Sequence, residues 1–216
     1  MPEVFGYLFA VLIGYLLGCS NLAFFLARSR GVDILHLGTC NPGTSNAMIL
    51  MGWKAGVLVG IHDIGKGLLA VLLCGLLFPA LPYCREIAGF CCVIGHLYPF
   101  YLRFRGGKGF ATYLGVVGGL DIRFALILGA VIILLVLITD YMVSGTLATV
   151  ISSPIYFLVT KWYAAAAMLA VLTAIILYKH RENFVRILKG TEIGLRRANR
   201  GELRADRPNN ESPPEE

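Results

Sequence analysis

Charged residues are scarce in this sequence. Asp, Glu, Lys and Arg make up 15% of its 216 residues, whereas 57% are hydrophobic, and the mean hydropathy is +0.72. An average soluble domain carries about 25% charged residues and fewer apolar ones. The composition therefore argues against a soluble globular protein and predicts a polytopic membrane protein built as one domain.

Several catalytic and metal-binding signatures are also missing. The four histidines show no HxxxH or HExxH spacing, and the sequence contains no GxSxG elbow. The six cysteines form no CxxC pair, so we interpret them as small buried side chains, with a reactive thiol as the alternative for Cys40, which lies in a polar loop. The sequence thus predicts no metal, no cofactor and no serine-hydrolase triad.

Long apolar runs fill most of the chain and predict an all-α fold of seven transmembrane helices. The first run lacks the basic start of a cleaved signal and is too long for a signal core, so we expect it to remain as a span. The fourth run is too short to cross straight and is expected to be a thin span or a half-helix. The expected spans are residues 4–27, 55–78, 86–101, 110–120, 124–139, 143–160 and 163–179. Residues 1–190 would form the membrane domain, and residues 191–216 a basic, then acidic tail that is disordered at its end.

The distribution of Lys and Arg predicts the orientation of the chain. Nine of the 19 lie between residues 179 and 207, and six more fall in loops on the same side of a seven-span chain. The opposite side holds only Arg85, Arg123 and Lys161. By the positive-inside rule we expect a multi-pass protein of the cell inner (plasma) membrane, with its N-terminus outside and its C-terminus in the cytoplasm. Aromatic residues are not interleaved with the basic region, which argues against a nucleic-acid partner and favours contact with the lipid bilayer.

The stretch GHLYPFYLRFRGGKGFATYLG at residues 95–115 predicts an anion-binding loop. Gly106, Gly107 and Gly109 flank Lys108, and such glycines let successive backbone N–H groups point into one concavity beside the ammonium. The apolar run that follows can begin a helix whose N-terminus faces the same anion. His96 is either a proton shuttle or a histidine satisfied by a neighbouring helix.

A second polar loop, GTCNPGTSN at residues 38–46, is expected on the same side of the membrane. Its hydroxyls, amides and glycines are typical of a phosphate cradle, and Thr44 or Ser45 is expected to cap the helix that follows. Alone, the loop is better interpreted as a solvated turn, but together with the Lys108 loop it predicts a binding site. The candidate residues are Thr39, Asn41, Gly43, Ser45 and Asn46.

Further candidates lie within a span and at span ends. Asp63 and Lys66 stand at i, i+3 on one helical face, where they form either a functional pair or a purely structural ion pair. The last two spans carry polar residues at their cytoplasmic ends that can close the site, although the one that begins the sixth span can equally be a helix cap. These residues are Ser144, His180, Glu182 and Asn183.

Over residues 14–190 the sequence resembles the bacterial acyl-phosphate-dependent glycerol 3-phosphate acyltransferases. The resemblance is specific in GHxxP at residues 95–99 and in FxGGKGxAT at residues 104–112. The family's first motif, SGNxGATNxxR, corresponds to TCNPGTSNAMI at residues 39–49, so Ile49 stands where the family has arginine and Lys54 is the nearest cation that follows. Asp63-x-x-Lys66-Gly67, Ser144 and His180-Arg181-Glu182-Asn183 also fit the family pattern.

The resemblance implies a seven-span enzyme whose active site faces the cytoplasm. Such an enzyme transfers an acyl chain from acyl phosphate to the 1-hydroxyl of glycerol 3-phosphate, giving lysophosphatidate and phosphate for phospholipid synthesis. The resemblance also implies that Lys108, with the amides of Gly106 and Gly107, binds phosphate, and that His180 and Asn183 orient the acceptor hydroxyl. Because the first-motif arginine is absent, a related acyltransferase with a different phosphorylated acceptor stays an alternative. An anion transporter is another, although polar residues clustered on one face favour the enzyme.

Overall fold

The computed structural model describes residues 2–194 and 196, and over these residues the chain is helical, without a strand. The predicted all-α fold is confirmed for this part of the chain. Residue 195 and residues 197–216, which hold most of the predicted tail, lie outside the described residues. The helices are α1 (Pro2–Cys19), α2 (Leu22–Ser29), α3 (Thr44–Met51), α4 (Trp53–Leu77), α5 (Cys84–Leu97), the 3₁₀ turn η1 (Phe100–Leu102), α6 (Phe110–Leu120), α7 (Ile122–Thr139), α8 (Met142–Val159), α9 (Tyr163–Lys179) and α10 (Arg181–Leu188).

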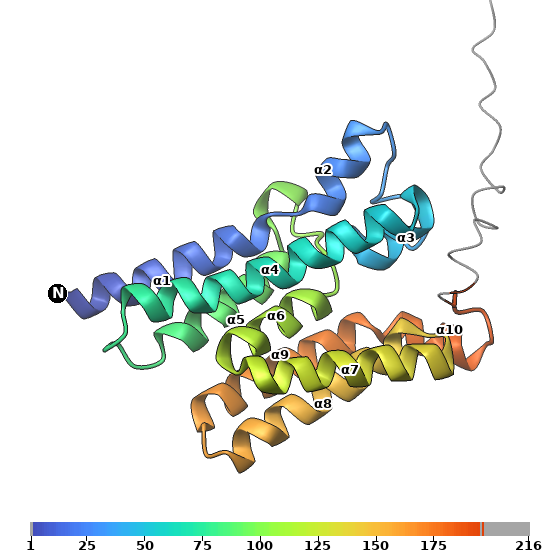
Figure 1. Ribbon diagram of the computed structural model, residues 1–216. Coiled ribbons are helices and arrows are strands. Elements are labelled where there is room, and N and C mark those ends of the chain that lie inside the picture. The colour runs from blue at the N-terminus through green and yellow to red at the C-terminus, as the bar shows by residue number, and fades with distance from the viewer. Residues whose placement is uncertain (1, 195, 197–216) are drawn as a thin grey trace, which may run out of the picture.

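The long helices form two groups with α6 between them (Figure 1). α1, α4 and α5 pack together on one side, and α7, α8 and α9 on the other, while α6 contacts helices of both groups. One core cluster joins the groups, because Val71 and Val93 of the first pack with Val116 of α6 and with Leu128 and Leu169 of the second. The loop before α6 therefore lies where the two groups meet.

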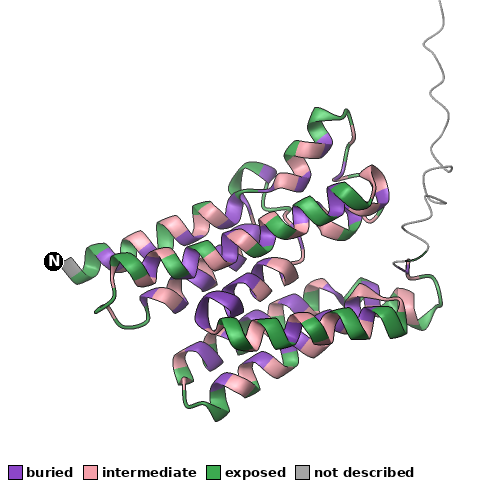
Figure 2. Ribbon diagram, viewed as in Figure 1, coloured by how far each residue is buried: buried purple, intermediate pink, exposed green. Residues whose placement is uncertain are grey.

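Apolar side chains cover much of the outer surface of the bundle, and α7 is largely exposed along its length (Figure 2). Leu126, Ile127 and Ile133 of α7 each expose more than half of their surface, and this helix buries Leu128 and Val136. Such a surface would drive association in water, but it is the expected lipid-facing surface in hydrocarbon. The packing therefore agrees with a bundle that is embedded in a membrane.

Fewer helices are long enough to cross a membrane than the sequence predicts. In the part of the chain that the structure describes, four segments are long and apolar enough to cross a membrane, and α9 and α10 make a fifth if that bent pair is taken as one span. α5 and α6 have 14 and 11 residues, which corresponds to about 21 and 16 Å of helix, less than the hydrocarbon thickness of about 30 Å. The count of seven transmembrane helices stays a prediction, whereas a short helix is present at residues 110–120 as expected.

The first predicted span is divided into α1 and α2. The Asn21 side-chain oxygen accepts a hydrogen bond of 2.9 Å from the Phe24 N–H and caps α2, and the Asn21 amide donates to the Pro42 carbonyl over 3.1 Å. A capping residue has non-helical backbone, which interrupts the helix at this point. The same side chain ties the end of the span to the second polar loop.

The region between the first two predicted spans contains the helix α3. Its N-cap is Gly43, which makes no side-chain capping bond. The expectation that Thr44 or Ser45 caps this helix is therefore wrong, because both residues already lie in its first turn. A cap needs extended backbone, and here Gly43 supplies it with φ −141° and ψ 179°.

Candidate active site

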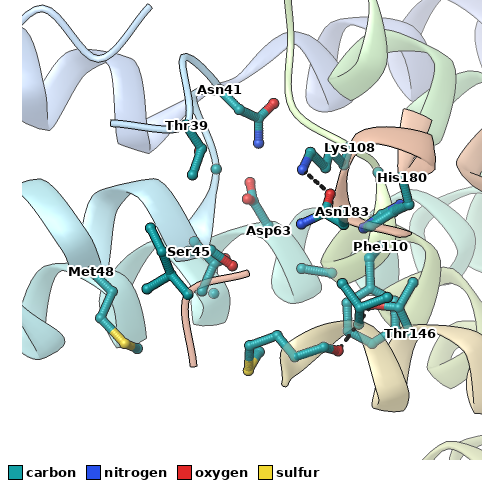
Figure 3. A pocket seen from close by; sticks show the side chains of 18 of the residues that line it. Thr39, Asn41, Ser45, Met48, Asp63, Lys108, Phe110, Thr146, His180 and Asn183 are labelled. Atoms are coloured by element: carbon teal, nitrogen blue, oxygen red, sulfur yellow. Dashed lines mark hydrogen bonds between the residues drawn. The ribbon is translucent and has the colours of Figure 1, made fainter. Parts of the chain in front are cut away.

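The predicted site residues converge on one pocket at the end of the bundle where α3, α6, α8 and α10 come together (Figure 3). The cavity has a volume of about 250 Å³. Ten predicted residues line it, namely Thr39, Asn41, Gly43, Ser45, Asp63, His96, Lys108, Gly109, His180 and Asn183. The other six, Asn46, Lys66, Gly106, Gly107, Ser144 and Glu182, are not among its lining residues. The two polar loops, far apart in the sequence, thus share one cavity.

Lys108 reaches across the pocket from the loop before α6. Its Nζ donates a hydrogen bond to the Asn183 Oδ1 of α10 (Figure 3). The pKa of Lys108 is lowered from 10.5 to about 8, first by burial and then by repulsion from Arg186, against the opposing effect of Glu192. The ammonium is still protonated at neutral pH and offers a charged donor to an anion in the pocket.

The glycines that precede Lys108 have another role than the predicted one. The Gly106 N–H donates to the Leu97 carbonyl and the Gly107 N–H to the His96 carbonyl, each over 3.1 Å. The prediction that these amides bind phosphate is therefore wrong in this fold, because they pair with carbonyls at the end of α5 that have no partner within the helix. A Cβ atom at Gly107 would overlap the His96 ring, so glycine is needed here for close packing.

The first turn of α6 supplies backbone donors in place of those amides. Gly109, Phe110 and Ala111 all line the pocket. The first N–H groups of a helix have no intrahelical partner, and the helix dipole favours an anion beside them. The predicted role of this helix N-terminus thus agrees with its place beside Lys108.

Lys66 lies outside the pocket lining, and three acceptors surround its ammonium. Its Nζ lies 2.8 Å from the Asp63 carboxylate in the predicted i, i+3 pair, 2.6 Å from the Ser20 carbonyl and 2.8 Å from the His96 Nδ1. An ammonium has three protons and no acceptor, so these contacts use all of its donors and make His96 Nδ1 an acceptor. The geometry favours the structural interpretation of Lys66 and of His96, although Asp63 and His96 still line the pocket.

The loop of residues 39–46 divides its polar side chains between the pocket and the fold. Thr39, Asn41 and Ser45 line the pocket. Asn46 is fully buried and bonds to three backbone groups, since its amide donates to the carbonyls of Ile34 and Leu37 and its oxygen accepts from the Thr39 N–H. Asn46 therefore holds the loop in shape and does not reach the cavity.

An apolar residue lines the pocket where the resembled family has arginine. Ile49 is 7% exposed and belongs to the pocket lining. Lys54 does not replace the missing charge, because its Nζ lies over the Trp53 ring, 5.9 Å from the ring centroid, and outside the pocket lining. This wall of the pocket therefore carries no cation.

The candidates from the last two spans differ in whether they reach the pocket. The His180 Nδ1 donates to the Ile176 carbonyl over 2.8 Å, which leaves Nε2 of a neutral ring as an acceptor. Ser144 is not the helix cap that the alternative expects, because it lies in the first turn of α8, whose N-cap is Tyr141, and its hydroxyl donates to the Tyr141 carbonyl over 2.7 Å. Glu182 is exposed and pairs with Arg181 over 3.7 Å, so it faces away from the cavity.

Two charged residues that line the pocket were not foreseen from the sequence. Arg186 and Glu192 line the cavity, and the Arg186 Nε donates to Glu192 over 2.7 Å. Arg186 stands three residues after Asn183, so helical spacing could have revealed it. Glu192 follows α10 in a segment assigned to the tail, where no pattern marks it. The remaining wall is apolar and includes Leu114, Ile132, Met142 and Val143.

Comparison with known proteins shows the family to which the chain is similar. A family profile described as Glycerol-3-phosphate acyltransferase matches residues 8–190. A glycerol-3-phosphate acyltransferase of Clostridioides difficile (strain 630) is 36% identical over 195 residues, covering 88% of this chain and 96% of that protein; one of Brucella anthropi is 37% identical over 184 residues, covering 85% and 90%. The crystal structure of PlsY, an integral membrane glycerol 3-phosphate acyltransferase, in its glycerol 3-phosphate form is 34% identical, with a TM-score of 0.82 over 88% of this chain and 95% of that one.

Proposed function

The chain belongs to the glycerol-3-phosphate acyltransferase family, and we propose that it transfers an acyl chain from acyl phosphate to the 1-hydroxyl of glycerol 3-phosphate. The products are lysophosphatidate and inorganic phosphate. The PlsY structures that resemble the chain are described as a glycerol 3-phosphate form and a lysophosphatidic acid form, which supports both the acceptor and the product. The acyl-phosphate donor is our inference from the sequence resemblance and from the chemistry of the pocket.

The observation that carries the proposal is the mixed lining of the pocket. It combines Lys108 and the N-terminus of α6 with apolar residues such as Leu114, Ile132 and Val143. Cationic, donor-rich groups suit a phosphate group, and apolar side chains suit an acyl chain. Both parts of an acyl phosphate therefore find matching surroundings in one cavity.

The chemistry needs no protein nucleophile. The hydroxyl oxygen of the acceptor attacks the acyl carbon, the bond from that carbon to the phosphate oxygen breaks, and phosphate leaves with the electron pair. The His180 Nε2 and Asn183 are placed to orient the hydroxyl, whose proton passes finally to the departing phosphate. Lys108 and the α6 N-terminus stabilise the charge that develops on phosphate, so positioning and electrostatics supply the rate.

We also propose that this pocket faces the cytoplasm at the plasma membrane. α2, α3 and α10 lie at the pocket end of the bundle (Figure 1). Eight of the 14 Lys and Arg residues in residues 1–190 belong to α2, to α10, to the C-cap residues of these two helices or to the Lys108 loop. Arg85, Arg123 and Lys161 lie next to the ends of α5, α7 and α8 that face away from it. The positive-inside rule therefore places the pocket on the cytoplasmic side.

A direct assay tests the proposal. Purified protein is incubated with palmitoyl phosphate and glycerol 3-phosphate, and lysophosphatidate is followed by mass spectrometry. Matched reactions replace the donor with palmitoyl-CoA, or the acceptor with glycerol or another phosphorylated polyol. We expect lysophosphatidate only with palmitoyl phosphate and glycerol 3-phosphate together, and its loss in Lys108→Ala with membrane insertion retained.

The acceptor series also distinguishes the alternative raised by Ile49. Turnover with a different phosphorylated polyol, but not with glycerol 3-phosphate, would favour an acyltransferase with another acceptor. Movement of phosphate into sealed vesicles without acyl transfer would favour an anion transporter. The pocket lining comes from one end of the helices, which supports the enzyme over a path through the membrane.

A further inference from the structure

The segment after α10 folds back over the pocket. Gly190 has a left-handed φ of +67°, which reverses the chain, and the N–H groups of Thr191 and Glu192 both donate to the Arg186 carbonyl, over 2.8 and 3.2 Å. Glu192, Ile193 and Gly194 then line the cavity. We call residues 190–194 the C-terminal strap. A reversal at a glycine C-cap is thus what returns Glu192 to the site.

Glu192 stands at the centre of a chain of polar contacts. Its two carboxylate oxygens accept from the Asn183 Nδ2 over 2.6 Å and from the Arg186 Nε over 2.7 Å, and its side chain is 10% exposed. The Asn183 Oδ1 in turn accepts from Lys108. A carboxylate only accepts, so Glu192 forces the Asn183 amide to direct its NH₂ group toward the strap and its oxygen toward Lys108.

Arg186 keeps its terminal nitrogens available. Its side chain bonds through Nε to Glu192, and within residues 2–194 and 196 its two terminal nitrogens have no hydrogen bond. The residue lines the same cavity as Lys108, and their positive charges act on each other. A guanidinium held at one edge presents its remaining donors in a fixed direction, which suits a phosphate group.

We propose that Arg186 is a phosphate-binding residue of this pocket and that Glu192 is the positioning residue that aims Arg186 at the phosphate and holds the Asn183 oxygen against Lys108. The proposal rests on the proposed function for the identity of the phosphate carriers. The strap is also held at its far side, where the Arg196 N–H donates to Asp140 over 2.9 Å and the Arg196 side chain donates to the Leu137 carbonyl over 3.0 Å. With both sides tied down, the Glu192 carboxylate is a fixed part of the site.

The opposite role for Glu192 is that of an internal anion that occupies the phosphate position and must be displaced. The two roles predict opposite changes in phosphate affinity for Glu192→Gln. Loss of a positioning carboxylate weakens phosphate binding, because Arg186 and the Asn183 amide lose their fixed directions. Loss of a competing anion strengthens phosphate binding, because one negative charge leaves the pocket.

Titration calorimetry with inorganic phosphate measures this sign without any turnover. The wild-type protein, Glu192→Gln and the control Asp33→Asn are compared at constant ionic strength, and Asp33 is an exposed residue paired with His36 outside the pocket. We expect roughly 10-fold weaker phosphate binding in Glu192→Gln, from the size of hydrogen bonds to charged groups, and no change in Asp33→Asn. Unchanged or tighter binding in Glu192→Gln overturns the proposal, as does a wild-type protein that binds no phosphate.

Phosphate binding in a conservative variant and steady-state kinetics provide two further measurements that a purely structural role would not change. Glu192→Asp keeps the charge and should recover part of the phosphate binding that Glu192→Gln loses, at an equal thermal midpoint. Arg186→Lys should raise the KM of the substrates less than Arg186→Met does, with kcat affected less than KM in both. Equal KM values in wild type and Arg186→Met overturn the phosphate role of Arg186.

The two sets of results separate this inference from the proposed function. A wild-type protein that makes no lysophosphatidate, but loses phosphate affinity in Glu192→Gln, would remove the proposed function and leave the role of Glu192 intact. Normal turnover together with phosphate affinity unchanged in Glu192→Gln would leave the proposed function intact and remove the role of Glu192.

Discussion

At the scale of single residues, Lys108 depends on groups from three parts of the chain. The loop before α6 presents it, Asn183 of α10 accepts its hydrogen bond, and the charges of Arg186 and Glu192 adjust its pKa. Burial lowers the pKa of the lysine into the range near physiological pH, and below this pKa its ammonium is charged and can bind an anion. The protonation of Lys108 should therefore be visible in the pH dependence of the reaction rate.

We expect kcat/KM to fall as the pH rises through about 8. Lys108 has a pKa lowered to about 8, so it is charged below this pH and loses the charge that attracts phosphate above it. The profile of kcat/KM reports groups of the free enzyme, and initial rates across the neutral and alkaline range give the limb. Any turnover left in Lys108→Ala should lack this limb, and a wild-type profile that stays level into the range of an ordinary lysine would contradict the assignment.

Ile49→Arg tests whether the pocket is built for glycerol 3-phosphate. Ile49 lines the cavity, so a guanidinium at this position would add a forked donor for the acceptor phosphate. We expect the KM for glycerol 3-phosphate to fall by about 10-fold with little change in kcat. Lys54→Met is the matched control and should change neither value, because Lys54 rests on Trp53. An unchanged KM in Ile49→Arg would argue for another acceptor.

Sequence reasoning identified the pocket residues that lie in a distinctive local sequence. Lys108 stands between glycines and Asn183 follows a histidine in a basic run, and both line the pocket. It misjudged Gly106 and Gly107, because the partners of their amides are carbonyls at the end of α5, and helix ends are the least certain feature of a sequence. It missed Glu192, because that contact exists only after the chain reverses at Gly190.

At the scale of helices, long apolar runs predicted the elements well and short polar ones poorly. The short helix α6 and the last long helix α9 have the expected bounds. α3 and α10 have eight residues each, which is too short to be stable alone, so their helicity comes from packing that no local pattern reveals. These two short helices supply Ile49 and Asn183, so the element-scale errors fall on the site itself.

The contact between α4 and α6 makes the strongest stability prediction. A Cβ atom at Gly115 of α6 would overlap the Ile64 carbonyl of α4, so Gly115→Ala must push the helices apart. We expect a loss of about 1–3 kcal/mol in the free energy of unfolding, together with reduced activity, because Asp63 of α4 and Lys108 share the pocket. Thermal unfolding in detergent measures the change.

Gly129→Ala is the control for that substitution. Gly129 lies in α7 with no atom within 4 Å of an added Cβ, so the same change of residue should be neutral or slightly stabilising there. Equal thermal midpoints for the two variants would contradict the close helix contact.

At the scale of the whole molecule, Cys40 offers a test of orientation with the native sequence. It is the exposed member of the six free cysteines, the others being buried or partly buried. A membrane-impermeant maleimide should therefore label Cys40 in inverted vesicles and leave it unlabelled in intact spheroplasts, if the pocket end faces the cytoplasm. Lys161→Cys, in a background with Cys40→Ser, should show the opposite pattern. Labelling of Cys40 from outside would reverse the proposed orientation.

The shortness of α6 has a consequence for the bilayer. A helix of about 16 Å leaves roughly half of a hydrocarbon layer of about 30 Å uncovered, and this helix begins at the pocket. α6 is mostly buried between the two helix groups, so water and head groups, and not lipid tails, must follow the pocket floor downward. The thickness of the bilayer should then affect the rate of turnover. After reconstitution, turnover should be fastest in phosphatidylcholines with short acyl chains and decline as the chains lengthen. A rate that is independent of bilayer thickness would mean that the pocket lies level with the membrane surface.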